Sequence, residues 1–235
     1  VLLGDRYEVI KQQVEDEAVK GNRVLLLGKV DQITLKKGIF SEVEEYALIL
    51  IEDVIKEEAP KALNYFKEEG VNLKVISGDN PVTVSAVAKR AGVEGYDKYV
   101  DARTLPSKIE DLEKVVDNYV IFGRVTPHQK KHIVMALQRK GHTVAMTGDG
   151  VNDVLALKES DCGIAMANGS EATKSVAQLV LMNSDFGALP KVVKEGRKQI
   201  NNLERVAQLF LSKTMFFVSL TLIMSLLMLP YPLLP

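Results

Sequence analysis

The chain has 235 residues, of which 46% are hydrophobic and 26% charged, and its formal net charge is -1. This composition excludes a disordered chain, and the balanced charge and the lack of tryptophan argue against a nucleic-acid partner. The single cysteine, Cys162, lies in an apolar run and is interpreted as a buried structural thiol. We therefore expect a globular protein in a reducing compartment.

Helix and strand signals begin near the N-terminus. A polar helix is expected over about 5–20 and strands over 23–30 and 45–52, and the link between the strands is rich in turn residues. This link predicts a domain boundary near residue 42.

From residue 59 onwards helices and strands alternate with short connections. The expected helices cover 59–69, 81–92, 107–117, a stretch from 127, 150–158 and 170–177, and the expected strands 72–77, 119–123, 142–147, 162–166 and 178–182. This alternation predicts a Rossmann-like α/β fold, a parallel sheet with helices on both faces. Ligands of such sheets bind at the carboxyl ends of the strands.

The C-terminal part predicts one long helix. Residues 209–229, "LFLSKTMFFVSLTLIMSLLML", carry one charge, Lys213, and are long enough to span a lipid bilayer; a buried core helix is the alternative. The preceding stalk, 186–208, carries an excess of basic residues, which predicts that this side is cytoplasmic. Residues 230–235 would begin the following loop.

Polar residues follow several of the predicted strands. "VISGDN" places Ser77, Gly78, Asp79 and Asn80 at the start of a helix, where backbone N–H groups favour a phosphate. Each of these residue types is also a common turn or cap residue. The sequence therefore predicts either an anion site or an ordinary helix start at this position.

A second strand end carries acidic residues. "AMTGDGVND" brings Asp149 and Asp153 to one turn, where paired carboxylates repel each other unless a cation lies between them. Lys130, in the first turn of the helix that opens at Pro127, could reach a phosphoryl oxygen. A hydroxyl, a lysine and two aspartates at strand ends together predict Mg²⁺-assisted phosphoryl transfer.

Three segments carry a resemblance to a known family. "TGDGVND" resembles the hinge motif of P-type ATPases, the membrane pumps of the haloacid dehalogenase superfamily, and "SGDNPVT" and "FGRVTPHQK" are similar to two of their other motifs. The resemblance implies that 43–185 is a haloacid dehalogenase-like phosphorylation domain and 1–42 the end of a nucleotide-binding domain. It also implies a location in the cell membrane with a cytoplasmic catalytic domain, with Mg²⁺ and ATP as cofactors.

The resemblance assigns roles to the matching residues. It implies that Asp149 binds Mg²⁺, with Asp153 as a second acidic ligand, and that Asn152 and Asp153 organise the phosphorylation site. Ser77 and Gly78 would hold phosphoryl oxygens, and Lys130 would neutralise charge during transfer. Asp79 and Asn80 would contribute to nucleotide binding. Asp53 and Lys56 match the hinge segment near the nucleotide, although lysine stands where the family has arginine, which loses the planar fork.

The family phosphorylates an aspartate in a D-K-T-G-T string, which this chain does not contain. We expect that aspartate upstream of residue 1, so the chain alone should not catalyse turnover. The stretch "LSKTMFFVS" has Thr214 and Phe217 where calcium and sodium/potassium pumps would have Asn and Glu. Its S-K-T pattern is similar to a bacterial branch of cation pumps, the CtpE-type transporters, with calcium as the candidate transported cation. Two alternatives stay open: a soluble Mg²⁺-dependent phosphohydrolase and a non-catalytic membrane-anchored regulator.

The histidines offer one further interpretation. His128 and His132 share a face of one predicted helix and could bind zinc, but no third ligand has a matching spacing. We expect both to be solvated helix residues.

Overall fold

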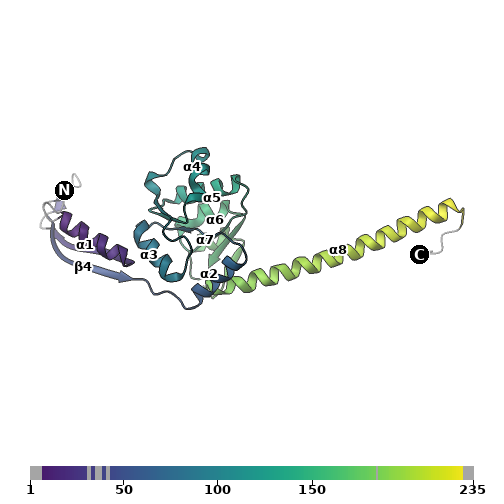
Figure 1. Cartoon of the computed structure of the whole chain (residues 1–235), viewed down its shortest axis with the longest axis horizontal. Coiled ribbons are helices and arrows are strands. Elements are labelled where there is room, and N and C mark those ends of the chain that lie inside the picture. The colour runs from purple at the N-terminus through teal and green to yellow at the C-terminus, as the bar shows by residue number, and fades with distance from the viewer. Residues whose placement is uncertain (1–6, 31–32, 35–38, 41–42, 184, 230–235) are drawn as a thin grey trace. The chain divides into compact units, whose positions relative to one another are not determined.

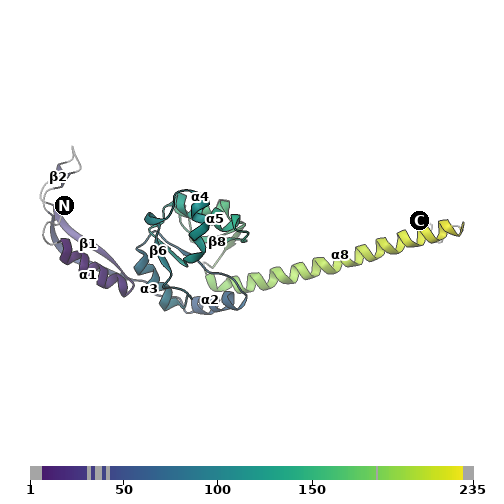
Figure 2. The same cartoon turned by 45° about the horizontal axis from the view of Figure 1, so that its top comes forward.

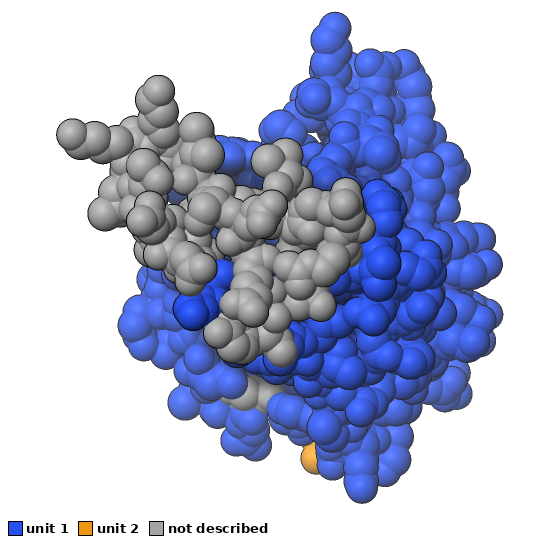
Figure 3. All heavy atoms as spheres, turned by 90° about the vertical axis from the view of Figure 1, so that its left-hand side faces the viewer, with its two compact units in different colours: residues 1–187 blue, residues 188–235 orange. Residues whose placement is uncertain are grey.

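The computed structural model describes residues 7–30, 33–34, 39–40, 43–183 and 185–229. The chain divides into two compact units, Val1–Gly187 and Ala188–Pro235 (Figure 3). The predicted loop at 230–235 and residues 35–38 and 41–42 of the predicted link lie outside the described residues.

The first described elements form a helix and an antiparallel hairpin (Figures 1 and 2). These elements are α1 (Tyr7–Val19), β1 (Asn22–Val30) and β4 (Val43–Glu52), and a short pair, β2 (Ile33–Thr34) and β3 (Ile39–Phe40), lies between the two long strands. β1 pairs with β4 along its whole length, with a bulge at Leu27/Gly28. Among the described strands β4 therefore pairs only with β1 and not with the parallel strands.

Two three-stranded parallel sheets form the α/β part of the first unit. One has the order β5-β7-β6 and the other β10-β9-β8. Their strands are β5 (Val75–Ile76), β6 (Tyr99–Asp101), β7 (Ile121–Gly123), β8 (Ala145–Gly148), β9 (Cys162–Met166) and β10 (Leu179–Leu181). The predicted α/β fold is confirmed, but the described strands form two sheets, and β6 was not predicted.

The helices begin and end close to the predicted positions. They are α2 (Glu58–Glu68), α3 (Pro81–Ala91), α4 (Ile109–Val115), α5 (Pro127–Arg139), α6 (Val154–Glu159) and α7 (Glu171–Val176). α3 starts with proline in its first turn and ends at Gly92, whose φ of 86° is left-handed. α5 starts with a capping box in which the side chain of Thr126 and that of Gln129 each bond the other's backbone N–H.

Helices cover both faces of the β5-β7-β6 sheet. The side chains of successive residues of β7 point to opposite faces, as the period of two in a strand requires. Ile121 and Phe122 are both fully buried; Ile121 packs in a cluster with Ala88 and Val93, whereas Phe122 belongs to the cluster of α4 and α5. Burying such a side chain contributes roughly 1.5–3 kcal/mol, so this short strand has a large share in the core.

α5 joins the cores of the two sheets. Its residues Ile133 and Ala136 pack in the cluster of Phe122, and Val134 packs with Met146 of β8 and with α6. Ile76 of β5 and Val144, which directly precedes β8, both pack against the Phe122 cluster. The strands β5 and β8 therefore lie against the same hydrophobic core.

The second unit is dominated by α8 (Leu189–Leu226), a continuous helix of 38 residues with Pro190 in its first turn (Figure 1). Among the described residues it is the one helix that is long and apolar enough to cross a membrane. Thr214 and Thr221 donate their hydroxyls to the carbonyls of Phe210 and Phe217, at 2.9 and 2.8 Å. The two hydroxyls are thus satisfied within the helix, which makes them compatible with an apolar surrounding.

Gly123 offers a test of the packing between β7 and α3. A Cβ at this position would lie 2.5 Å from the backbone Cα of Pro81, so the start of α3 would have to move. We expect Gly123→Ala to lower the free energy of unfolding by about 1–3 kcal/mol in urea titrations followed by circular dichroism. Gly150→Ala is the control, because its Cβ would meet its nearest atom at 3.6 Å. Equal losses in both variants would contradict this account.

Candidate active site

The loop after β5 is held by its own side chains and by β7. The Asp79 N–H donates to Ser77 Oγ at 3.1 Å, and the Val82 N–H donates to Asn80 Oδ1 at 3.0 Å. From the other side, the N–H groups of Arg124 and Val125 donate to the carbonyls of Asp79 and Ser77, at 2.7 and 3.0 Å. The Ser77–Asn80 loop is therefore fixed along both of its sides.

Lys130 and Asp153 form a buried ion pair. Lys130 Nζ lies 2.6 Å from Asp153 Oδ1, and the two side chains are only 12% and 10% exposed. The other carboxylate oxygen accepts the Gly150 N–H at 3.2 Å. A Cβ on Gly148 would lie 2.6 Å from that of Asp153, so only glycine fits at the end of β8. The pair therefore links α5, which follows β7 of the first sheet, to the turn after β8 of the second sheet.

Asp149 lies in the same turn with a different environment. Its carbonyl accepts the Ser170 N–H at 2.8 Å and the Thr173 hydroxyl at 3.3 Å, so its backbone is fixed by the start of α7. Its side chain is exposed, and among the described residues its carboxylate has no hydrogen bond or ion pair. Of the two aspartates, Asp149 is therefore the one whose oxygens are available to a cation, and Asp153 is neutralised by Lys130.

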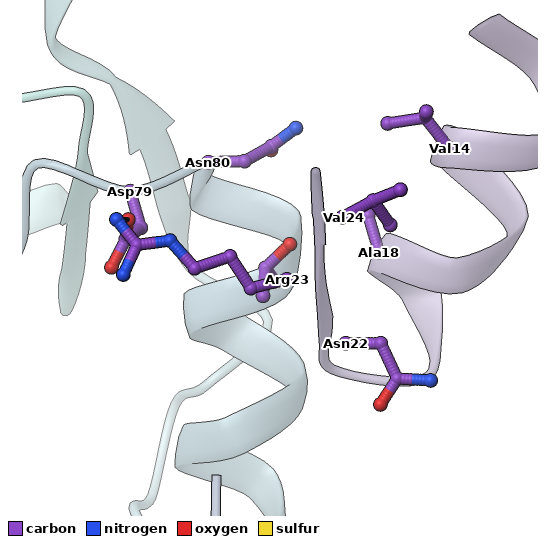
Figure 4. Close-up of a pocket in the computed structure, with 8 residues that line it drawn as sticks. Val14, Ala18, Asn22, Arg23, Val24, Asp79 and Asn80 are labelled. Atoms are coloured by element: carbon purple, nitrogen blue, oxygen red, sulfur yellow. Dashed lines mark ion pairs between the residues drawn. The ribbon is translucent and has the colours of Figure 1, made fainter. Parts of the chain in front are cut away.

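Arg23 contacts the Ser77–Asn80 loop, which the sequence did not reveal. Its guanidinium pairs with Asp79 Oδ1 at 2.9 Å, as the close-up of the cavity shows (Figure 4). The cavity, about 180 Å³, lies between the α1–β1 segment and the start of α3 and includes Val14, Asn80 and Thr83. Arg23 precedes Asp79 by more than fifty residues along the chain, and no local pattern connects them.

Two arginines bind Asp101, and one of them, Arg124, also contacts the Ser77–Asn80 loop through its backbone N–H. Asp101, at the end of β6, accepts bonds from the Arg103 guanidinium and from Arg124 Nη1, the latter at 2.7 Å. The Arg103 guanidinium, with a smaller contribution from Arg124, holds the pKa of Asp101 well below its usual range against the opposing effect of burial. Asp101 therefore stays charged at neutral pH.

The remaining predicted site residues either make ordinary structural contacts or are exposed. Asn80 uses its side chain as the N-cap of α3, which is the ordinary alternative for this residue. Asn152 is exposed, and so are Asp53 and Lys56, in the connection between β4 and α2. Arg90 of α3 donates to the Asp53 carbonyl at 3.3 Å. The nucleotide roles of Asp53, Lys56 and Asn80 stay predictions.

The other sequence interpretations also have structural counterparts. His128 and His132 line a cavity of about 170 Å³, and no cluster of three His, Cys, Asp or Glu side chains that could hold a metal occurs among the described residues. Cys162 is partly exposed at the start of β9, so the expectation of a buried thiol was wrong in degree. Ser170 caps α7 by accepting the Thr173 N–H at 3.1 Å.

The fold and the site define the class of protein. The model of the haloacid dehalogenase-like hydrolases matches residues 2–161, which is more than half of the chain. The chain belongs to the haloacid dehalogenase-like hydrolase family.

Within this class the chain is similar to P-type ATPases. It is 49% identical over 222 residues to the calcium-transporting ATPase CtpE of Mycobacterium bovis, which covers 94% of this chain and 28% of that protein. It is 47% identical over 208 residues to the probable cation-transporting ATPase exp7 of Streptococcus pneumoniae, covering 87% and 26%. The predicted resemblance to CtpE-type pumps is confirmed, and the chain spans less than a third of the length of these relatives.

A solved structure supports the same fold. The zinc-transporting PIB-type ATPase in its E2.Pi state aligns with 92% of this chain and 30% of its own, with a TM-score of 0.65 and 20% sequence identity. At this identity the likeness establishes the fold alone.

The buried ion pair leads to a prediction about stability. We expect Lys130→Met to lower the free energy of unfolding by about 3–5 kcal/mol, because the Asp153 carboxylate is left buried without its counter-charge. Adding Asp153→Asn should recover a large part of that loss, measured by urea unfolding of the single and double variants.

Lys131→Met is the matched control on the same helix. Its pair with Glu159, at 3.2 Å, is 38% and 30% exposed, so its loss should stay below about 1 kcal/mol. A double variant in which the two single losses simply add would show that Lys130 and Asp153 are not coupled.

Proposed function

We propose that this chain is part of a cation-transporting P-type ATPase, in which ATP hydrolysis through an aspartyl-phosphate drives an ion across the cell membrane. The observation that carries the proposal is that the Ser77 loop, the Lys130–Asp153 pair and the unpaired Asp149 carboxylate each lie just after the carboxyl end of a parallel strand, where such folds bind ligands. The relatives support calcium as the transported cation through the name of the CtpE pumps.

The residues present fit Mg²⁺. This ion binds through one or two carboxylates together with phosphate oxygens and water, and it does not need a protein cage. Asp149 offers such a carboxylate on a backbone fixed by Ser170 and Thr173. When bound, Mg²⁺ would polarise the phosphoryl group and offset its charge.

The chain's own groups would then position and stabilise the phosphoryl group. Ser77 and Gly78 would contact phosphoryl oxygens. The Lys130 ammonium would place positive charge where negative charge develops, and its fixed bond to Asp153 means that little reorganisation is needed in transfer. Arg23 adds a second cation beside the loop through its pair with Asp79.

The proposal places the phosphorylated aspartate on a further strand, and the unpaired edges of β5 and β8 are compatible with it. Among the described strands β5 pairs only with β7, and β8 pairs only with β9, so each has an unpaired edge. Both lie against the Phe122 cluster through Ile76 and Val144. A parallel strand from another part of the full-length protein would fit between these edges and bring its carboxyl end to the site.

The membrane helix separates this proposal from its alternatives. A soluble phosphohydrolase would leave the exposed apolar side chains of α8 in water. A non-catalytic regulator would not need the Lys130–Asp153 and Asp149 arrangement. The pump accounts for both the site and the helix, with α8 as stalk and membrane span and the first unit in the cytoplasm.

The proposal predicts how the chain binds Mg²⁺ and phosphate. We expect Asp149→Asn to weaken Mg²⁺ binding at least about 10-fold in isothermal titration calorimetry, because a charged oxygen ligand is lost. Ser77→Ala should weaken binding of inorganic phosphate in the presence of Mg²⁺ and leave Mg²⁺ binding alone unchanged.

Asp111→Asn controls for the loss of an acidic group elsewhere, since Asp111 lies on α4 and pairs with Lys114. It should bind both ligands as the wild type does. Equal affinities in all variants, or no binding by any form, would refute the proposed site.

A further inference from the structure

Resting on the proposed function, we infer that Asp101 is a positioning residue for the phosphoryl-binding loop: it anchors the side chain of Arg124 and thereby holds the Arg124 backbone N–H on the carbonyl of Asp79. Asp101 belongs to none of the strand-end motifs at Ser77, Lys130 and Asp149. It acts through Arg124 and has no contact of its own with the reacting groups.

Asp79 is the centre of the loop. Its N–H donates to Ser77 Oγ within the loop at 3.1 Å, and its carboxylate pairs with Arg23 of β1 at 2.9 Å. Its carbonyl accepts the N–H of Arg124, which follows β7, at 2.7 Å. The last of these is the shortest and comes from the neighbouring strand end. A change at Arg124 is therefore transmitted directly to the loop that follows β5.

The Arg124 bond depends on an unusual backbone conformation. Arg124 has φ of 54°, and among the described residues only Met228 shares a positive φ without being glycine. This left-handed conformation is unfavourable for a residue with a Cβ, and it persists only where neighbouring contacts hold it. With it, the successive N–H groups of Arg124 and Val125 both point into the loop, toward the carbonyls of Asp79 and Ser77.

The contact that holds Arg124 in place is its side chain on Asp101. Arg124 Nη1 lies 2.7 Å from Asp101 Oδ2, and the aspartate side chain is 19% exposed. Asp101 is itself immobilised, because its Oδ1 accepts the Arg103 N–H at 3.0 Å and its carboxylate accepts the Arg103 guanidinium. The fixed Asp101 carboxylate at the end of β6 thus holds the backbone conformation of Arg124 after β7. The Arg124 N–H in turn holds the loop after β5 in position.

Hydrogen exchange tests this chain of contacts in the complete chain in detergent micelles, without Mg²⁺ or phosphate. In Asp101→Asn we expect the Arg124 amide to lose about 10-fold of its protection, because the anchored conformation opens more often. The amides of Ile133 and Leu137 in α5 should keep theirs.

A glycine at position 124 distinguishes a positioning role of Asp101 from a general effect of its loss on stability. Glycine adopts a left-handed φ without an anchor, so Asp101→Asn combined with Arg124→Gly should regain most of the lost protection at residue 124. Asp111→Asn is the control, because Asp111 lies on α4 and pairs with Lys114, and its Arg124 protection should stay within about twofold of the wild type. Loss of protection across α5 in Asp101→Asn, or no recovery with glycine, would overturn the inference.

A second measurement keeps the inference distinct from the proposed function. Asp101→Asn should weaken binding of inorganic phosphate with Mg²⁺ by about the same factor as it lowers protection, and the glycine double variant should regain it. Unchanged phosphate affinity alongside lost protection would overturn the positioning role. If no form binds phosphate while exchange responds as expected, the anchor stands and the proposed function fails.

Discussion

The ion pair between Lys130 and Asp153 is the interaction on which the arrangement of the site depends. Both side chains are nearly buried, so each charge needs the other, and their pairing fixes the turn after β8 relative to α5. The pair also explains two glycines: Gly148 leaves space for the aspartate, and Gly150 offers it an N–H. Asp153 is neutralised by Lys130, whereas Asp149 keeps an exposed carboxylate in the same turn. One short segment therefore supplies a carboxylate that stabilises the fold and a second carboxylate that is free to bind a cation.

Much of the fold could be predicted because its signals are local. Proline at the start of α3 and α5, Gly92 at the end of α3 and the apolar run of α8 each mark an element by rules that act within a few residues. β6 was missed because it is a strand of three residues whose sequence, Tyr99–Asp101, has no period to detect. The division into two sheets could not be foreseen either, since it depends on which strand edges meet.

The site was predictable to the extent that its residues follow strands. Lys130, Asp149 and Asp153 stand out because parallel strands bring their carboxyl ends together. Arg23, Asp101 and Arg124 act through partners 23 to 56 positions away along the chain, and such pairs leave no trace in a single sequence. Asn80 shows the opposite case, because the same residue type serves equally as a ligand and as a helix cap, and the structure uses it as a cap.

The unpaired edges of β5 and β8 have a consequence for the isolated chain. An edge strand exposes a row of N–H and C=O groups that another chain can use as a template, and proteins commonly cover or interrupt such edges. In this chain β5 pairs over only two residues, which limits the template, but β8 extends over Ala145–Gly148 and ends at the site. Of the two edges, the longer edge of β8 is therefore the more exposed to pairing with a second molecule, and such pairing would take place directly beside the turn that carries Asp149 and Asp153.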